Sequence, residues 1–543
     1  MNLLKDRGKK RRMKLLLLLC LLCLPWFAPA AECPNIVVVL VDDMGFSDIG
    51  CYGGEIPTPN IDALAAGGVR FTQFYNTGRC CPTRASLLTG LYSHQAGIGL
   101  MTGDQGAPGY RGFLNDRCVT IAEVLRLAGY LTAHTGKWHV GHGDDARLPL
   151  QRGFDRFYGV PEGGGFYFKP KAGRTVRLGN EIVHGPGKPA PDGWYSTDAW
   201  TDYGLRFIDE ARAAKQPFFL YLAHNAPHFP LQAAPEDIAK FRGKYKAGWD
   251  ALRAQRHARQ KELGVVAPSW PLTPRDATIA AWDTLSVGEQ DTLDLRMALY
   301  AAVMHRLDRA IGTLVAGLKD RGVLDNTLLF FLSDNGASDE GGLHGKSGGG
   351  TPGSAESDVY PGRAWANVSD TPFRLYKKNS HEGGIATPLI AHWPTGIAAR
   401  GEWRAQPGHV IDLMATCVDV AGAKYPTEHN GKPIQPMEGR SLLPAFKNEP
   451  IPRDALFWEH EGHAAMRAGN WKLVRQGRNG AWELYDLAAD RTELNNLAAT
   501  QPDRVKELAA LWEAWAQRAQ VKPYPGNNRL NEGAKQKGNQ KPK

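Results

Sequence analysis

The sequence predicts an α/β protein with a mostly parallel sheet flanked by helices, followed by a small antiparallel α+β subdomain near the C-terminus. Apolar, β-branched runs alternate with helical segments along the chain, which favours a parallel sheet. Four of these runs end directly in acidic, basic or imidazole residues. Because ligands bind outside the carboxyl ends of strands in such sheets, this recurrence predicts one functional site at that edge. Several short strands after about Gly439 predict the subdomain.

The first apolar run, Asn35 to Val41, is typical of a strand that is buried on both faces. It ends in Asp42 and Asp43. Two adjacent carboxylates after a buried strand are costly unless a cation or hydrogen bonds compensate them, so the pair favours a divalent metal site. Taken alone, the pair fits an ordinary acidic loop equally well.

The stretch around Cys80 predicts an anion site. Pro82 is well placed in the first turn of a helix, and Gly90 ends that helix. Cys80 then lies just before a helix N-terminus, where free N–H groups and the macrodipole favour a tetrahedral oxyanion such as phosphate or sulfate. The alternative is that Cys80 and Cys81 form disulfides, as adjacent cysteines in an exported protein can.

Helical spacing of apolar residues recurs in further segments between and after the strands. One of them carries a capping box, Thr120 with Glu123. The predicted helices are Pro59 to Ala66, Thr120 to Ala128, Thr292 to Lys319 and Gln501 to Ala519. Residues 241 to 292 have no clean period and are interpreted as a surface insertion.

Three later buried strands also lead into polar groups, which the sheet edge would bring together. These strands and the groups after them are Tyr130 to Thr135 with Lys137 and His139, Pro217 to Ala223 with His228, and Asp325 to Leu332 with Asp334 and Asn335. Asp334 and Asn335 form a second pair of hard oxygen donors.

The C-terminal part changes character after a last apolar strand, Pro388 to Trp393. Gly469 and Asn470 form a hairpin turn within a series of short strands. The predicted short strands are Ala455 to His460, Ala464 to Ala468, Trp471 to Arg475 and Trp482 to Asp486. Two motif-like patterns are rejected: the phosphate-binding loop around Lys346 has Glu340 where glycine is required, and His463 comes one place too early for a zinc protease helix.

The composition, 43% hydrophobic and 22% charged, is that of an ordinary soluble globular protein. Residues 1–30 carry seven Lys and Arg against one acid, and residues 521–543 carry six against one, so of the formal charge of +9 about −2 is left for the rest. The basicity therefore lies at the two ends, and no nucleic-acid partner is expected.

The N-terminal residues have the pattern of a secretory signal peptide: basic residues, the apolar run Leu15 to Leu24 and a small-residue cleavage site, Ala28-Pro29-Ala30. The run is too short to span a membrane, so we expect a periplasmic or secreted protein without a stable membrane anchor. The predicted division is a signal peptide (1–30), a catalytic domain (31–438), a C-terminal subdomain (439–520) and a flexible basic tail (521–543).

The string Cys80-Cys81-Pro82-Thr83-Arg84 fits C-x-P-x-R, and RCCPTRASLLTG from Arg79 to Gly90 resembles the signature of the formylglycine-dependent sulfatases. The resemblance extends from about Asn35 to Tyr485 and is strongest to the bacterial arylsulfatase-like branch. It implies an alkaline-phosphatase-like fold, and a maturation enzyme that oxidises Cys80 to formylglycine. It also implies a Ca²⁺ ion, or in some members Mg²⁺, and the matching ligand positions are Asp42, Asp43, Asp334 and Asn335.

The resemblance also implies a role for each remaining position. The hydrate of formylglycine 80 would attack sulfur with help from the metal, and Arg84 would steady its hydroxyl. Lys137 and His139 match the pair that helps the sulfated intermediate collapse. His228 matches the group that, with a lysine, protonates the leaving oxygen. Lys377 aligns best with that lysine, and Lys378 is the alternative.

The predicted function is therefore a sulfuric ester hydrolase that acts on an aryl or carbohydrate sulfate. The alternatives are a phosphodiesterase or phosphonate monoester hydrolase of the same superfamily, and a non-catalytic carbohydrate-binding relative. Residues 100–118, 153–195 and 336–370 are expected to line the pocket. Four aromatic residues there either stack on a sugar or aryl ring or serve in packing: Phe166, Tyr167, Phe168 and Trp365.

Overall fold

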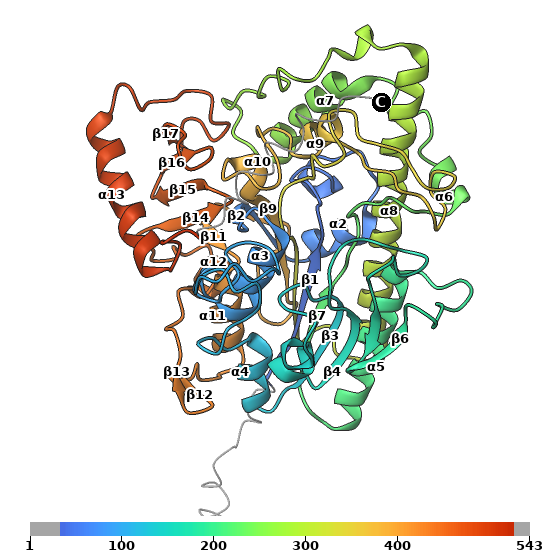
Figure 1. Cartoon of the computed structure of the whole chain (residues 1–543), viewed down its shortest axis with the longest axis vertical. Coiled ribbons are helices and arrows are strands. Elements are labelled where there is room, and N and C mark those ends of the chain that lie inside the picture. Colours follow the sequence, from blue (N-terminus) through green and yellow to red (C-terminus); the bar gives the residue numbers. More distant parts are fainter. Residues whose placement is uncertain (1–32, 526–543) are drawn as a thin grey trace, which may run out of the picture.

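The structure is a computed structural model that describes residues 33–525. Within this range the chain forms an eleven-stranded sheet between two layers of helices, and a four-stranded antiparallel sheet near its C-terminal end (Figure 1). The predicted fold class is therefore confirmed. The predicted signal peptide, residues 1–30, and the tail after residue 525 lie outside the described residues.

The large sheet is mostly parallel, with β9 and β5 running against their neighbours. Its spatial order is β10 (Glu402–Arg404), β2 (Val69–Tyr75), β9 (Ala386–His392), β8 (Thr327–Ser333), β1 (Asn35–Val41), β7 (Phe218–Ala223), β3 (Leu131–Lys137), β4 (Arg156–Val160), β5 (Val176–Leu178) and β6 (Glu181–His184). The short strand β11 (Gly408–His409) also pairs with β2. A separate hairpin joins β12 (Glu428–His429) to β13 (Lys432–Pro433).

Strand β1 lies in the middle of the sheet and is parallel to both neighbours, β7 and β8. Its side chains alternate between two apolar clusters. Val37, Val39 and Val41 belong to one cluster, and the residues between them belong to the other. This two-sided burial is what the continuous apolar run predicted.

Helices cover both faces of the sheet, with α2, α5 and α8 on one side and α3, α4 and α11 on the other (Figure 1). Their bounds are α2 (Pro59–Ala66), α3 (Cys80–Thr89), α4 (Ile121–Leu127), α5 (Ser196–Ala213), α8 (Val287–Asp320) and α11 (Asp412–Val420). The other helices are α6 (Pro235–Ala239), α7 (Gly248–Leu263), α9 (Arg363–Ser369), α10 (Glu382–Ile385), α12 (Leu443–Phe446) and α13 (Pro502–Arg518).

Two predicted helix-end signals are confirmed, the capping box of α4 and the glycine that ends α3. Thr120 and Glu123 form the capping box of α4, and Glu123 N donates to Thr120 Oγ1 over 3.1 Å. Gly90 ends α3 in the left-handed region with φ +69°. Helix α8 begins earlier than predicted, at Val287, because Ser286 and Glu289 form a second capping box.

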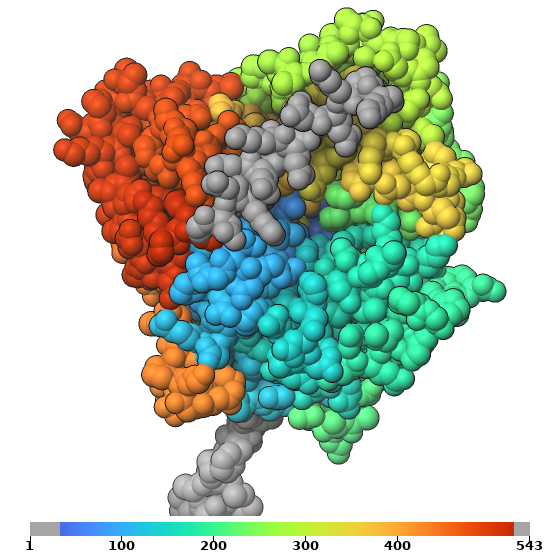
Figure 2. All heavy atoms as spheres, viewed as in Figure 1, coloured from blue at the N-terminus to red at the C-terminus, as the bar shows by residue number. Residues whose placement is uncertain are grey.

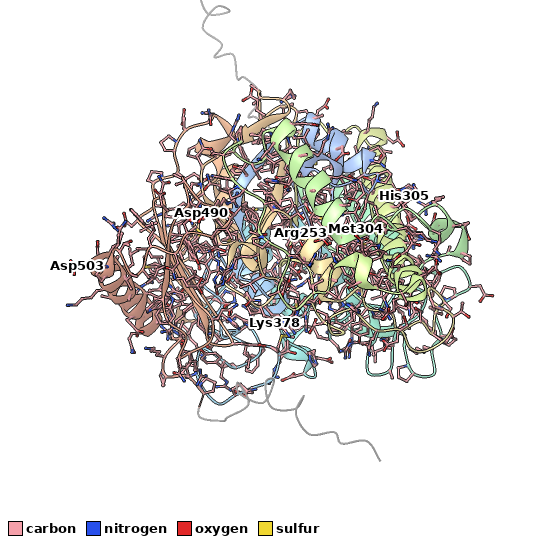
Figure 3. The ribbon with its side chains drawn as sticks, turned by 90° about the horizontal axis from the view of Figure 1, so that it is seen from above. Arg253, Met304, His305, Lys378, Asp490 and Asp503 are labelled. Atoms are coloured by element: carbon pink, nitrogen blue, oxygen red, sulfur yellow. The ribbon has the colours of Figure 1, made fainter. Side chains whose placement is uncertain are left out.

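The interpretation of residues 241–292 as a surface insertion is wrong. They contain the sixteen-residue helix α7, whose inner face is partly polar: Arg253, Arg256 and Gln260 are buried together with Trp249 and Leu252. Arg256 forms ion pairs with Asp48 at 2.8 Å and with Glu55 at 2.7 Å. Figure 3 shows Arg253 near the middle of the molecule. Because charged and polar side chains occupy part of the buried face, apolar residues do not recur at helical spacing along this segment.

The C-terminal sheet is a meander of β14 (Leu456–His460), β15 (His463–Ala468), β16 (Trp471–Arg475) and β17 (Glu483–Asp486), with α13 packed against it. It forms a lobe at one side of the main body (Figure 2). Trp458 Nε1 donates to Asn76 O over 2.8 Å, and Arg467 Nη1 donates to Tyr75 Oη over 2.7 Å. These contacts fix the lobe to the end of β2, just before the segment that contains Cys80.

A buried group of charges joins the same two parts. Lys472 Nζ lies 2.8 Å from both Glu382 Oε1 and Glu493 Oε1, and Arg491 Nε lies 2.7 Å from Glu382 Oε2. All four side chains are fully buried. Glu382 belongs to the main body, so the lobe is held to it by ion pairs as well as by aromatic packing.

Among residues 33–525, no helix combines the length and the apolar character that crossing a bilayer requires.

Candidate active site

The register of the central strands brings the two predicted acidic pairs together. Val41 at the end of β1 pairs with Ser333 at the end of β8, so Asp42 and Asp334 follow at the same edge of the sheet. Asp334 N donates to Val41 O over 3.0 Å. The strand ends therefore place both pairs in one buried centre, as their positions predicted.

The oxygen donors of this centre are close to one another and poorly satisfied. Asn335 Nδ2 donates to Asp43 Oδ1 over 2.7 Å, which turns the amide oxygen away from Asp43. Asp42 Oδ1 and Asn335 Oδ1 are buried and have no hydrogen-bond partner. Orphaned carboxylate and amide oxygens on buried side chains suit a hard cation such as Ca²⁺ or Mg²⁺. The residues present thus fit the metal that the resemblance implies.

Three buried cations surround these carboxylates. Lys137 Nζ lies 2.6 Å from Asp42 Oδ2, Arg84 Nη2 lies 2.7 Å from Asp334 Oδ2, and Lys377 Nζ lies 2.6 Å from Asp43 Oδ1. Burial alone would raise the pKa of Asp42, but the charges of Lys137, His228 and Arg84 hold it below its usual value. Asp42 therefore stays ionised and available as a ligand, whereas burial and the charge of Asp42 raise the pKa of Asp334 well above its usual value.

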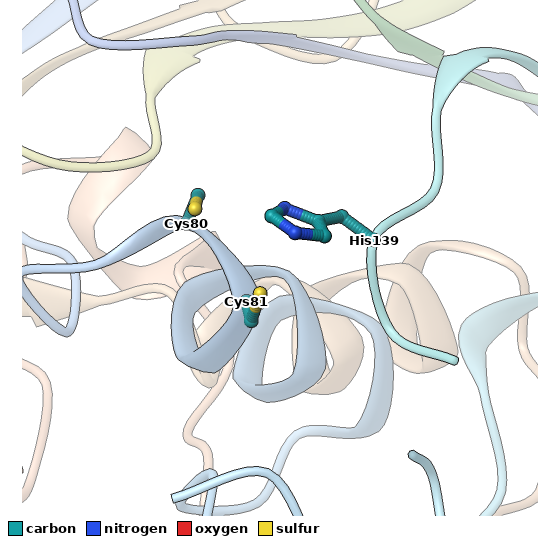
Figure 4. Close-up of side chains that lie close together, drawn as sticks. All are labelled: Cys80, Cys81 and His139. Carbon is teal, nitrogen blue, oxygen red and sulfur yellow. The ribbon is translucent and has the colours of Figure 1, made fainter. Parts of the chain in front are cut away.

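Cys80 is the first residue of α3 and is 2% exposed. Its thiol, the Cys81 thiol and a ring nitrogen of His139 lie within 4.8 Å of one another (Figure 4). A hydrogen bond from Cys81 lowers the pKa of Cys80 well below its usual value, and Lys137 and His139 add to this against the effect of burial. Burial also lowers the pKa of His139 to about 4, so its ring is neutral at physiological pH.

His228 and Lys377 both contact Asp43. His228 Nε2 is 3.5 Å from Asp43 Oδ2, and its Nδ1 faces Phe229 O at 2.5 Å. The choice between the two candidate lysines is also clear. The Lys377 side chain is 1% exposed and contacts Asp43, whereas the Lys378 side chain is 31% exposed and lies 3.5 Å from Glu340.

In Figure 3 Lys378 lies between the C-terminal lobe, marked by Asp503, and helix α8, marked by Met304. The greater exposure of Lys378 places it on the rim of the site and supports Lys377 as the buried lysine that the resemblance implies. All ten predicted site residues thus belong to one connected cluster at the carboxyl edge of the sheet.

Sequence reasoning missed two carboxylates that support the site. Glu340 lies 3.2 Å from Lys377 Nζ, 3.5 Å from Lys378 Nζ and 3.5 Å from Arg79 Nη1. Asp370 accepts from Phe46 N at 3.4 Å and from Ala337 N at 3.0 Å, so it joins the loops after β1 and β8. No sequence pattern around Glu340 or Asp370 indicates this role, because the groups that they contact are distant in the sequence.

The aromatic residues that might have stacked on a substrate serve in packing. Phe166, Tyr167 and Trp365 are buried, and Trp365 Nε1 donates to Leu293 O over 3.0 Å. Phe168 is only partly buried and packs against the same apolar cluster. The ring of Phe229 lies against the site, with its centroid 4.2 Å from that of His228.

A mostly parallel sheet with buried carboxylates and the cysteine-bearing start of helix α3 at its carboxyl edge is an alkaline-phosphatase-like fold. The chain belongs to the sulfatase family, since the Sulfatase family model matches residues 34–423. A second model, N-sulphoglucosamine sulphohydrolase, C-terminal, matches residues 373–519. Family membership makes the protein a sulfatase, an enzyme that hydrolyses sulfate esters.

Individual relatives agree with this assignment. An uncharacterized sulfatase of Schizosaccharomyces pombe is 35% identical over 522 residues, which are 88% of this chain and 92% of that protein. An arylsulfatase of Klebsiella aerogenes is 38% identical over 439 residues, which are 76% of this chain and 92% of that protein.

Solved structures share the fold. The crystal structure of Ps i-CgsB in complex with k-i-k-neocarrahexaose has a TM-score of 0.67 and 27% identity, and covers 93% of this chain and 97% of its own. The phosphonate monoester hydrolase of Agrobacterium radiobacter, at 20% identity and a TM-score of 0.55, covers 90% of this chain and 96% of its own. This second likeness is one of fold alone.

Proposed function

We propose that this sulfatase removes sulfate from a carbohydrate or aryl sulfate ester, using formylglycine formed from Cys80 and a bound Ca²⁺ or Mg²⁺ ion. One observation carries the proposal: Cys80, within its C-x-P-x-R string, lies at the start of a buried helix beside a centre of unsatisfied oxygen donors. The charge of Cys80 is near enough to affect the pKa of Asp42. Nucleophile and cation would therefore meet at the same sulfate group.

Four side chains would hold the cation: Asp42, Asp43, Asp334 and Asn335. When bound, the cation would neutralise charge on the sulfate and on the attacking oxygen. Arg84 would orient residue 80, because its guanidinium is fixed by Asp334 and donates from Nη1 to Lys137 O over 2.9 Å. An aldehyde hydrate at residue 80 would supply the oxygen that attacks sulfur.

Two pairs of residues would divide the proton transfers between the two sides of the sulfate. On the side of residue 80, Lys137 binds charge, and the neutral ring of His139 can accept a proton from the hydroxyl that residue 80 carries. On the side of Asp43, Lys377 binds a sulfate oxygen and His228 donates a proton to the leaving oxygen. The contacts of Lys137 with Asp42 and of Lys377 and His228 with Asp43 support this division.

A saccharide is the favoured leaving group. The relative Ps i-CgsB, at 27% identity over nearly the whole chain, has been solved with the carbohydrate k-i-k-neocarrahexaose. The rim of the present site carries charged, partly exposed groups from three segments, Arg79, Glu340 and Lys378, which can bind hydroxyl groups. An aryl sulfate would make fewer of these contacts.

The proposal includes export and maturation. The N-terminal pattern supports a periplasmic or secreted location, and a maturation enzyme would have to convert Cys80. N-terminal sequencing of protein from the culture medium or periplasm tests the export. Cleavage after Ala30 is the expected result, and an intact N-terminus in the cytoplasm would contradict it.

The decisive test combines mass spectrometry with paired assays. We expect the peptide that contains residue 80 to carry an aldehyde in protein made together with a maturation enzyme. That protein should hydrolyse an aryl sulfate faster than an aryl phosphodiester, and the Cys80→Ala variant should hydrolyse neither. An intact thiol at residue 80 in active protein would refute formylglycine as the nucleophile. A preference for the phosphodiester would favour a phosphonate or phosphodiester hydrolase.

A further inference from the structure

Cys81 has no role in sulfate hydrolysis, yet its thiol lies at the centre of a second group of ligand atoms. Cys80, Cys81 and His139 each place one donor atom within 4.8 Å of the other two, and all three are buried (Figure 4). None of them belongs to the oxygen-lined centre. The two groups also differ in chemistry, since one offers sulfur and nitrogen and the other offers oxygen.

We propose that the chain whose Cys80 has not been converted binds Zn²⁺ through Cys80, Cys81 and His139. Thiolate and imidazole are the ligands that Zn²⁺ prefers, whereas Ca²⁺ and Mg²⁺ prefer oxygen. Three protein ligands with one open position make a recognised zinc geometry. Each ion therefore has its own centre in the same cleft.

The imidazole is held in place for this role. His139 has φ +58°, which is uncommon outside glycine, so its backbone is fixed by the surrounding loop. Gly163 packs over the ring, since a Cβ there would lie 2.4 Å from His139 Cδ2. His139 Nδ1 is buried and has no hydrogen-bond partner. The ring is thus confined beside the two thiols and keeps a nitrogen that no protein group uses.

The surroundings of the thiols suit a soft cation. Met101 Sδ lies 3.8 Å from Cys81 Sγ, which adds a polarizable sulfur to the group. The nearby ammonium of Lys137 is already paired with Asp42 at 2.6 Å, so its charge is largely neutralised. Zn²⁺ binding requires both sulfurs as thiolates, so any proton that they carry would be released to solvent, and the two thiolates would balance the charge of Zn²⁺.

Conversion of Cys80 would abolish the site, because only one thiol and His139 would be left. The inference thus concerns the precursor, while the proposed sulfatase activity belongs to the converted protein. A filled zinc site would occupy the place that a sulfate group must reach. Precursor that has folded before conversion would be held in an inactive, zinc-bound form.

The test uses full-length protein made without a maturation enzyme, with an intact thiol at residue 80 verified by mass spectrometry. Excess Ca²⁺ is present throughout to fill the oxygen-lined centre, and Cd²⁺ serves as the optical probe for thiolate ligands. We expect one Cd²⁺ per chain, with a thiolate-to-metal absorption band, and displacement of that Cd²⁺ by Zn²⁺. Protein converted at residue 80 should show no such band.

Variants separate this site from other thiols. Removing a direct ligand costs more than the roughly 10–100-fold loss seen for outer partners, so Cys81→Ser should weaken Cd²⁺ binding by more than about 100-fold. Cys118→Ser and Cys417→Ser remove buried thiols elsewhere and should change nothing.

Cys81→Ser should also leave the Ca²⁺ affinity and, after conversion, the sulfatase activity unchanged, which shows that the variant folds. If it does not fold, Cys81→Ala provides the same comparison, and His139→Ala tests Cd²⁺ binding alone, each with circular dichroism as a check. A thiolate-to-Cd²⁺ absorption band of undiminished strength in the Cys81 variants would overturn the inference. The absence of this band in the unconverted protein would also overturn it.

Discussion

At the scale of single residues, Lys377 and Lys378 provide a sharp comparison between adjacent lysines. Lys377 is buried against Asp43, and Lys378 lies on the rim. We expect Lys377→Ala to reduce kcat/KM for an aryl sulfate by about 10²–10⁴-fold, the usual contribution of a group that acts on the leaving atom. Lys378→Ala should reduce it by less than about tenfold, mainly through KM. The opposite order would reassign the leaving-group lysine.

Asp370 supports a prediction about metal affinity. It joins the two loops that carry the oxygen donors through Phe46 N and Ala337 N. Asp370→Ala leaves these buried N–H groups without partners, which costs about 1–3 kcal/mol. We expect the Ca²⁺ dissociation constant to rise by roughly 10–100-fold, as for other outer partners of metal sites. Isothermal titration measures it directly.

The matched control for Asp370 is Asp339→Ala, which removes a more exposed carboxylate paired with Arg363 at 3.2 Å. It should leave the Ca²⁺ affinity unchanged. If Asp370→Ala also binds Ca²⁺ like the wild type, the two loops are held by something other than this carboxylate.

At the scale of elements, the end of α3 is tightly determined. Gly90 has φ +69°, and a Cβ there would lie 2.8 Å from Met414 Cβ on α11. Gly422, at the end of α11, has φ +58° but nothing within 4 Å. Gly422→Ala should therefore cost about 1 kcal/mol of unfolding free energy for the backbone alone. Gly90→Ala should cost clearly more, because the clash adds to the strain.

Chemical denaturation of both variants tests this difference. Equal losses of stability would show that α11 moves aside without cost. A loss of Ca²⁺ affinity in Gly90→Ala alone would show that the position of α3 also affects the centre beside Cys80.

The sequence predicted the elements whose buried side chains are apolar, but not the element that buries several polar side chains. Strand β1 and helix α8 have continuous or periodic apolar residues, so their existence and approximate ends were predictable. Helix α7 was not, because Arg253, Arg256 and Gln260 face the interior. Asp42 and Asp334 were predictable because they follow strands, whereas Glu340 and Asp370 gain meaning only from distant partners.

At the scale of the whole molecule, the buried charges around Glu382 make the stability of the contact between the C-terminal lobe and the main body depend on pH. Burial would raise the pKa of Glu382, but Lys472 and Arg491 lower it from 4.5 to about 2. A carboxylate with a lowered pKa stabilises the fold above its unfolded value and loses that contribution as the pH falls. Stability from this group should therefore be complete above pH 4.5 and disappear toward pH 2.

Glu382→Gln tests the same network at neutral pH. The substitution leaves two buried cations with one fewer carboxylate, and we expect the free energy of unfolding to fall by about 3–5 kcal/mol. The exposed pair of Glu210 with Arg156 is the control, and Glu210→Gln should leave the unfolding free energy unchanged. If the difference in unfolding free energy between Glu382→Gln and the wild type persists at acidic pH, Glu382 is not the group that titrates.

The division into a catalytic domain and a C-terminal subdomain near residue 438 remains our proposal, and these contacts bear on it. Glu382 and the lobe residues Lys472 and Arg491 share one buried network, and the second family match begins before that boundary, at residue 373. We expect a chain truncated after residue 438 to be unstable, because it would leave Glu382 buried without its cations.

The contact between Lys377 and Asp43 joins residues 334 positions apart. Helices and neighbouring strands can form early during folding, but this ion pair cannot form until two segments separated by more than half of the chain have been brought together. Recovery of ion binding and of turnover should therefore lag behind recovery of helical signal when the protein is refolded. Activity would then report on the last step of assembly, and short nascent fragments would be unable to act on any substrate.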